Sequence, residues 1–353
     1  MASKIDISAL TLNAEEASNA SELIIEKEFI NGVLSSVHDV VTGIEHKKQI
    51  PFVGHLTDSL KKATDCVPGE GGDIALTEKF WDPEIFDSRW THCAADLDKL
   101  LKLFQKAKRI NPDFYDRASS QEIGVVISLI GMMLRDVLPK KVWFSDKAAD
   151  VVGNAGNFTA GTDLDLYNVI DGLWKQIFSE ITAGSTYHVN IDANEGATKV
   201  LQVLAEDEAY DTLVAMDEKA DPRLLEQPDV QILMTRSMAD NYRATLRKKT
   251  LTAGFIEIAE NGKTVLKFDG IPIEVMYNWD RTIQADQNLG ATYNLPNRAV
   301  MTVPGNIPVG TLSEKDFEEL DSFYDRTLKS NIIDFAMSLD TKFLEDYMAV
   351  VAY

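Results

Sequence analysis

The sequence has few of the residues that would identify a disulfide-bonded, membrane-spanning or nucleic-acid-binding protein. Its 2 cysteines, Cys66 and Cys93, are too few for a disulfide framework or a zinc ribbon. The most apolar run, Ile123 to Leu134, is shorter than the roughly 20 residues that span a bilayer. The 35 basic residues are outnumbered by 56 acidic ones, and the resulting formal charge of −21 repels nucleic-acid phosphates. With no apolar secretory signal at the start, we expect reduced folding in the cytosol.

Local motifs for catalysis or metal binding are also missing. Gly262-Lys263-Thr264 looks like the end of a phosphate-binding loop, but Glu257 occupies the position of the required glycine. None of the 5 histidines has the i, i+4 spacing of a zinc-binding pair, and no GxSxG elbow occurs. Asp163 is better interpreted as a helix N-cap than as the start of a calcium loop. We therefore expect no catalytic residue, cofactor or metal site; a metal site built from distant segments is the less favoured alternative.

Three carboxylates gather in the stretch "LKFDGIPIEVMYNWDR": Asp269, Glu274 and Asp280. Paired carboxylates can serve as acid and base, so an acidic cytosolic α/β enzyme is one interpretation. Strand alternation, however, places Glu274 on the face opposite Ile273 and Val275, where a half-buried sheet normally carries charge. We favour this structural interpretation over the enzymatic one.

The first part of the chain predicts long helices around an extended excursion. Apolar spacing predicts a helix that ends at Gly43, followed by extended segments over 44–93 with a turn-rich tip. Two amphipathic helices follow, and the second is predicted to stop before Pro139. The glycine-rich stretch near 150–162 is the predicted domain boundary.

The second part alternates helices and strands. Asn194 is predicted to cap a helix that carries Val200, Leu201 and Leu204. "DVQILM" predicts a buried strand and "RSMADNYRATLRKK" the helix after it. A hairpin is predicted around Asn261-Gly262, and the next strand, in "GIPIEVMYNW", is expected to include Tyr277.

The order of these segments resembles that of the major capsid proteins of tailed bacteriophages. The matching segments include "PDVQILMTRSMADNYRATL", "FDGIPIEV" and "NRAVMTVPGNIPVGT", and the resemblance extends from about Glu15 to Thr311. It implies an α+β chain with the Hong Kong 97-type capsid fold: an N-terminal arm, an extended β-hairpin loop, a peripheral domain with a long helix, and an axial α/β domain.

The resemblance also implies a division into five segments. They are the N-terminal arm and helix (1–43), the extended loop (44–93), the peripheral domain with long helices (94–159), the axial domain (160–310) and a C-terminal segment returning to the peripheral domain (311–353). Since two helices stand where the family has one long spine helix, either could be the spine. The loop would lie across a neighbouring subunit through a set of apolar residues: Ile50, Phe52, Val53, Phe80 and Trp81. Three glycines would let its tip bend: Gly69, Gly71 and Gly72.

The function that the resemblance implies is structural. We expect self-assembly into hexamers and pentamers of an icosahedral head enclosing double-stranded DNA without specific binding, with scaffolding, portal and decoration or auxiliary head proteins as partners. The chain would assemble in the host cytoplasm and reside in the virion, with no membrane. A shell protein of an encapsulin-type bacterial nanocompartment is the nearest alternative.

Overall fold

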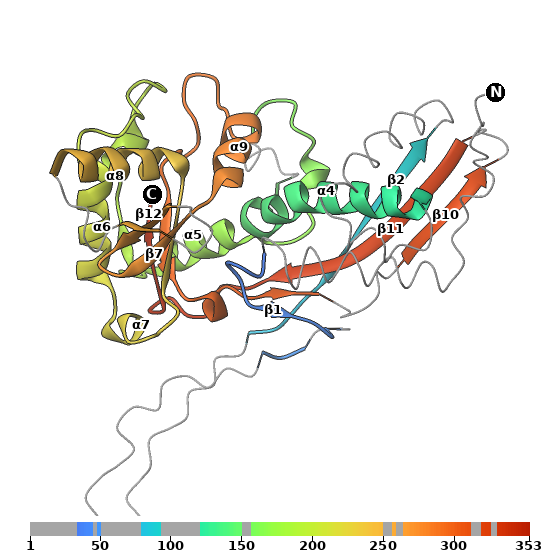
Figure 1. Cartoon of the computed structure of the whole chain (residues 1–353), viewed down its shortest axis with the longest axis horizontal. Coiled ribbons are helices and arrows are strands. Elements are labelled where there is room, and N and C mark those ends of the chain that lie inside the picture. The colour runs from blue at the N-terminus through green and yellow to red at the C-terminus, as the bar shows by residue number, and fades with distance from the viewer. Residues whose placement is uncertain are drawn as a thin grey trace, which may run out of the picture.

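The computed structural model shows two lobes that share a continuous buried core (Figure 1). One lobe is built on a 7-stranded sheet, and in the other a long helix lies beside a 5-stranded sheet. The structure describes residues 34–44, 48–50, 79–92, 121–149, 157–249, 256–258, 264–311, 319–325 and 330–353.

The central strands of the 7-stranded sheet are covered on both faces. Its strands, in spatial order, are β3 (His188–Val189), β12 (Ala349–Ala352), β8 (Ala299–Thr302), β4 (Gln231–Met234), β7 (Ile271–Val275), β6 (Thr264–Phe268) and β5 (Ile256–Ile258). Ile232 and Met234 pack with the helices α6 (Glu208–Lys219) and α8 (Arg236–Lys249), whereas Leu233 between them belongs to the core shared by the two lobes. Unbroken apolar strands such as β4 and β8 are typical of this two-sided burial.

Several predicted elements are confirmed in this lobe. The strand and helix expected in "DVQILM" and "RSMADNYRATLRKK" are β4 and α8. The expected hairpin also forms, because β5 and β6 pair antiparallel with Ile256 opposite Leu266; its tip lies outside the described residues. A second hairpin joins β6 to β7 through Asp269 and Gly270, whose φ angles of 45° and 90° suit a two-residue hairpin turn.

Two predictions for this lobe are wrong. Residues 196–204 form turns and no helix, since the buried Asn194 side chain donates to Asn297 O (2.7 Å) and accepts from Asn297 N (3.0 Å). At Gly196 a Cβ would lie 2.6 Å from Leu201 C, so the chain folds back tightly on itself here. Tyr277 does not extend β7: it begins the helix α9 (Tyr277–Asp286) and is 55% exposed.

The other lobe is organised by α4 (Gln121–Phe144), which passes through Pro139. The predicted helix end before this proline is therefore wrong. Val142, Trp143 and Phe144 follow the proline and are buried in the core. Their burial outweighs the hydrogen bond that a proline removes from a helix.

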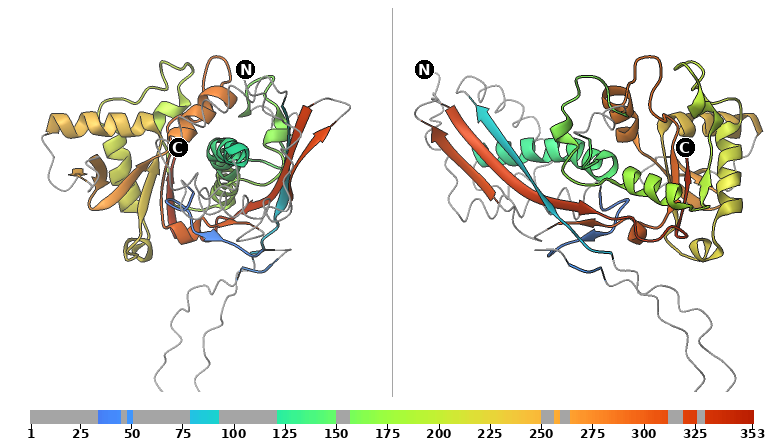
Figure 2. Two further views of the ribbon diagram at one scale, coloured as in Figure 1. Left: turned by 45° about the vertical axis from the view of Figure 1, so that its right-hand side comes forward. Right: turned by 180° about the vertical axis from the view of Figure 1, so that it is seen from behind.

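Long strands lie beside α4. β11 (Ser330–Thr341) pairs antiparallel with both β2 (Glu84–His92) and β10 (Glu319–Asp325). The sheet continues from β11 through β9 (Val309–Gly310) to the short β1 (Val40–Val41). The predicted helix end at Gly43 is therefore wrong, because Val40 and Val41 pair with β9 as a strand. Figure 2 shows these strands curving past the helix.

The remaining helices are short or lie between the lobes. They are α5 (Leu173–Ala183), α7 (Pro222–Leu225) and the 3₁₀ helices Leu164–Leu166, Asp192–Glu195 and Pro304–Asn306. The predicted N-cap at Asp163 is confirmed, because its carboxylate accepts the Asp165 N–H at 3.2 Å.

Candidate functional site: the interlobe junction and an exposed apolar turn

A tryptophan cluster joins the lobes. Trp143 of α4, Trp174 of α5 and Trp279 of α9 are buried, with ring centroids 4.6 Å apart for Trp143–Trp279, 5.0 Å for Trp174–Trp279 and 5.5 Å for Trp143–Trp174. Tilted and edge-to-face pairs at these distances stabilise beyond the burial of their area. Because the three rings come from three helices, they fix the angle between those helices.

A buried histidine attaches the N-terminal described segment to this cluster. Trp143 Nε1 donates to His38 Nε2 at 3.2 Å, and His38 Nδ1 lies 2.8 Å from Ile307 O. Because Nε2 accepts, the ring proton is on Nδ1 and is donated to the carbonyl. Burial lowers the pKa of His38 to about 4, although the Ile307 carbonyl favours the charged form. The imidazole is therefore neutral near pH 7.

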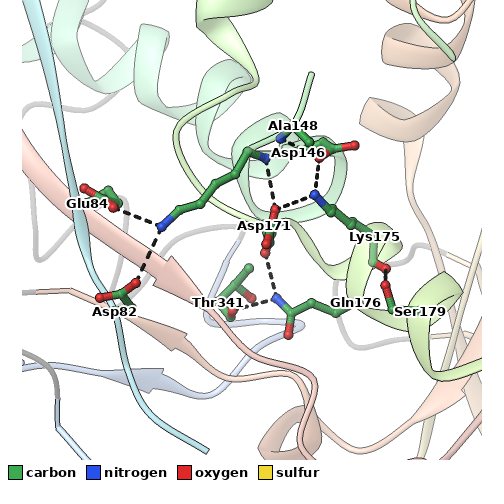
Figure 3. A network of polar contacts seen from close by, with 10 residues as sticks. Asp82, Glu84, Asp146, Ala148, Asp171, Lys175, Gln176, Ser179 and Thr341 are labelled. Atoms are coloured by element: carbon green, nitrogen blue, oxygen red, sulfur yellow. Dashed lines mark hydrogen bonds and ion pairs between the residues drawn. The ribbon is translucent and has the colours of Figure 1, made fainter. Parts of the chain in front are cut away.

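A polar network connects α5 to the long strands (Figure 3). Lys147 Nζ lies 2.9 Å from Glu84 Oε1 and 3.5 Å from Asp82 Oδ2. Burial alone would lower the pKa of Lys147, but the hydrogen bonds and charges of Glu84 and Asp82 raise it. The Lys147 backbone N–H donates to Asp171 Oδ1 at 2.9 Å, so one residue links β2 to the start of α5.

Gln176 completes this link. Its side-chain amide donates to Asp171 O (2.7 Å) and Thr341 O (2.8 Å) and accepts from Phe343 N (2.8 Å). Beside Thr341, the buried Asp340 carboxylate accepts from Asp82 N at 2.7 Å. The end of β11 is thus held to both α5 and β2.

Close backbone packing reinforces the junction at two glycines. A Cβ on Gly172 would lie 2.7 Å from Ser145 N, which places the start of α5 against the chain that leaves α4. A Cβ on Gly310 in β9 would lie 2.5 Å from Ile44 Cδ1 and 2.8 Å from Trp81 Cζ3. Larger residues at either position would displace their neighbours.

The predicted loop residues lie partly within the described structure. Gln49 and Phe80 form an antiparallel bridge, so the two arms of the predicted loop meet at its base. Ile50 and Trp81 are buried (9% and 3% exposed) against Ile44 and Leu344 of the same chain, and Phe80 is half-buried. Five other predicted loop residues lie outside the described residues: Phe52, Val53, Gly69, Gly71 and Gly72. That these residues contact a neighbouring subunit or bend the loop stays a prediction.

An apolar turn on the 7-stranded lobe was missed at the sequence level. Val200, Leu201 and Val203 are 80%, 61% and 70% exposed, although helical spacing had suggested a buried face for the first two. The turn is firmly anchored, because the buried Gln202 side chain donates to Tyr293 O (2.8 Å) and accepts from Tyr293 N (2.8 Å). Apolar side chains held outward in this way make the turn a candidate interaction surface. Only the glycine at 196 hinted that the segment turns.

The three carboxylates of "LKFDGIPIEVMYNWDR" do not form a common site. Asp269 lies in an exposed turn and Glu274 is exposed on β7. Asp280 Oδ2 accepts the Arg236 backbone N–H at 2.8 Å and so caps α8. In the described part of the chain no three His, Cys, Asp or Glu side chains come together as a metal site. None of the helices in the described ranges has the length and apolarity to cross a membrane.

Comparisons with known proteins found similar structures and no matching sequence. Neither a protein-family model nor a curated protein sequence matches the chain. Among solved structures, the satellite phage P4 procapsid with its size determination (Sid) protein contains a similar chain: the TM-score is 0.52 at 12% identity, covering 93% of this chain and 95% of that chain. The capsid of the cyanophage P-SCSP1u gives a TM-score of 0.49 at 14% identity, covering 90% and 86%. The encapsulin SrpI of Synechococcus elongatus PCC 7942 gives 0.44 at 10% identity, covering 91% and 85%.

The P4 likeness covers nearly the whole of both chains, and at this identity it establishes the fold alone. The chain therefore has the fold of a tailed-phage capsid protein, the Hong Kong 97-type fold that the order of its segments predicted.

Proposed function

We propose that this chain is a structural protein, without enzymatic activity, that assembles as hexamers and pentamers into the icosahedral head of a tailed phage. The observation that carries the proposal is the fold shared with the P4 procapsid chain over 93% of this chain and 95% of that one. Such a protein acts by burying surface between subunits, and obligate interfaces of this kind bury roughly 2,000 Å² or more.

The proposed domains follow the two lobes. Residues 1–43 would be the arm and first helix, 44–93 the extended loop, 94–159 the peripheral domain, 160–310 the axial domain and 311–353 the segment returning to the peripheral domain. α4 is the helix that we assign as the spine, since it lies along β2, β10 and β11. Two strands modify this scheme. β12 lies in the 7-stranded sheet, so the returning segment ends before it, and β9, at the end of the range 160–310, lies in the 5-stranded sheet.

The exposed turn supports the assembly proposal. Val200, Leu201 and Val203 lie outward on an anchored turn, and a soluble monomer gains nothing from exposing three adjacent apolar side chains. In a shell, a neighbouring subunit would cover them. Ile50 and Trp81 pack mainly against other residues of this chain. Only the small part of their surface that stays exposed could contact a neighbouring subunit.

The charge suits a container for double-stranded DNA. A net charge of −21 repels phosphates, so packaged DNA would be enclosed without adhering to the wall. Scaffolding, portal and decoration or auxiliary proteins would complete a head assembled in the host cytoplasm. A nanocompartment shell of the same fold would instead enclose cargo enzymes.

Negative-stain microscopy of the expressed full chain tests the proposal. We expect closed shells of uniform diameter when the chain is expressed alone or with its scaffolding protein. Monodisperse monomers under every condition would contradict the proposal. Purified native particles containing double-stranded DNA would support the phage head, and particles filled with an enzyme would support the nanocompartment.

The exposed turn allows a sharper version of this test. Replacing Val200, Leu201 and Val203 together by serine should lower the yield of shells while changing the free energy of unfolding of the monomer by no more than about 0.5 kcal/mol. Leu166→Ser, at a side chain 51% exposed, is the matched control. Equal shell yields for the triple variant and the control would remove the turn from the interface.

A further inference from the structure

Arg298 is a buried guanidinium whose hydrogen bonds all go to neutral groups. It is 1% exposed, and it donates from Nε to Leu295 O (2.7 Å) and from Nη2 to Gln287 Oε1 (2.9 Å) and Asn294 O (2.8 Å). Within the described part of the chain Nη1 has no hydrogen-bond partner. The rings of Trp174, Phe144 and Phe178 lie 4.9, 5.4 and 5.8 Å from Cζ.

This guanidinium also lacks a counter-charge. No carboxylate of the described residues forms an ion pair with Arg298. Burial lowers the pKa of Arg298 to about 9, which leaves it charged near pH 7, and the group that opposes this shift is the Tyr353 phenol. Burial raises the pKa of that phenol, so it is neutral and supplies no negative charge. A buried cation without an anion is costly, because no attraction to an opposite charge offsets the free energy lost when the cation leaves water.

A cavity of about 450 Å³ adjoins the guanidinium. It lies between the end of α4, one face of α5 and the loop before β8, and its lining includes Arg298, Lys175, Asp146, Ser145 and Trp174. The Asp146 carboxylate is already paired with Lys175, which also lies 3.0 Å from Asp171. Arg298 is thus the cation on this wall whose charge is not offset, in a chain that is otherwise strongly acidic.

Two further side chains of the lining have unused hydrogen-bonding atoms. Ser145 Oγ and Trp174 Nε1 are buried and have no partner among the described residues. The indole N–H can only donate, and a hydroxyl can donate as well as accept. Both atoms are closed to solvent, so they do not face the cavity directly, and Arg298 is the donor of this wall that lacks a charge partner. Buried polar groups normally find partners, so the guanidinium calls for a ligand that brings an acceptor and a negative charge.

We propose that this cavity binds a small oxyanion, a carboxylate or phosphate compound from solution, with Arg298 as its charge partner. Planar guanidinium groups pair well with both oxyanions because two N–H groups meet two oxygens. The ligand would neutralise Arg298 and, through it, hold the Asn294 and Leu295 carbonyls that precede β8. This proposal stands independently of shell assembly.

Thermal unfolding of the unassembled full chain at equal ionic strength tests this proposal, with potassium phosphate, potassium acetate and potassium chloride as probes. Phosphate or acetate should raise the midpoint temperature in a saturable way relative to chloride, because a ligand of the folded state stabilises it by mass action. The anion whose effect saturates at the lower concentration shows whether the ligand is a phosphate or a carboxylate compound. A linear, unsaturated rise would be the general effect of an excluded salt and would overturn the proposal.

Variants assign the effect to the cavity. Arg298→Met should lower the affinity for the anion that gives a saturable effect by about tenfold or more, as expected for the loss of a charged hydrogen-bonding partner. Lys199→Gln is the control, because Lys199 also lies over an aromatic ring, 4.3 Å from that of Tyr293, but belongs to another groove. If Arg298→Met does not fold, Arg298→Lys is the variant to measure, since it keeps the positive charge but loses the paired N–H donors of the guanidinium. Unchanged affinity in the folded Arg298 variant would overturn the proposal.

Discussion

The two sheets bury their central strands alike and differ at β2. In the 7-stranded lobe, β4, β8 and β12 are buried at every residue between helices. In the other lobe, β11 is buried at every residue from 332 to 341 except Asp334, whereas β2, which pairs with it, alternates exposed and half-buried residues, and Ile85 is 61% exposed. A strand whose outward side chains stay exposed leaves that face for solvent or a neighbour. The outer face of β2 therefore depends more on what lies outside the chain than any part of β4, β8 or β12.

The largest expected effect comes from breaking the junction between the lobes. Trp279→Ala removes a fully buried ring that contacts both Trp143 and Trp174, and it should lower the free energy of unfolding by about 3–5 kcal/mol. Chemical denaturation of the unassembled chain measures this loss. Ile85→Ala in β2 is the control, with an expected change within about 0.5 kcal/mol. Equal losses in the two variants would mean that the tryptophan cluster does not stabilise the junction.

A smaller loss is expected where β9 passes Trp81. Gly310→Ala would place a Cβ within 3 Å of Ile44 and Trp81, and the resulting displacement should cost about 1–3 kcal/mol. Gly305→Ala provides a matched control, since a Cβ there meets nothing within 4 Å. Comparison of the two thermal midpoints measures the difference. A Gly310 variant as stable as the Gly305 variant would show that this end of the sheet adapts freely.

The smallest effect is the dependence of junction stability on pH. His38 is neutral in the folded state with a pKa of about 4, below the value of 6.5 expected when it is unfolded. The unfolded chain therefore binds the extra proton first, and stability falls as the pH drops from 6.5 toward 4. Between pH 7 and pH 5.5 this amounts to about 1 kcal/mol. Denaturation of the wild type and of His38→Asn at both pH values isolates the contribution, and parallel pH dependences would refute it.

The sequence predicted the elements of the 7-stranded lobe best. β4 and α8 were found because an unbroken apolar strand and a 3.6-residue period are local signals. The end of α4 was missed because proline signals a local stop, and the burial of Trp143 that overrides it comes from tertiary packing.

The junction could not be predicted from spacing. Lys147, Asp82 and Gln176 lie far apart in the chain, and none belongs to a local motif. The exposed turn was missed for a related reason: apolar residues at helical spacing are more often core residues, and only the fold shows that Val200 and Leu201 lie outward. The sequence did not indicate that Arg298 is buried, since no local pattern distinguishes a buried arginine from an exposed one.

The position of β12 between β8 and β3 determines when the 7-stranded sheet can be completed during synthesis. This strand pairs with β8 on one side and with β3 on the other, and in the described structure β3 has no other partner strand. While the chain leaves the ribosome, β8 keeps an open edge until residues 349–352 have been translated. Nascent chains with such an edge are prone to mispairing. The 7-stranded sheet thus cannot be completed before residues 349–352 have been translated.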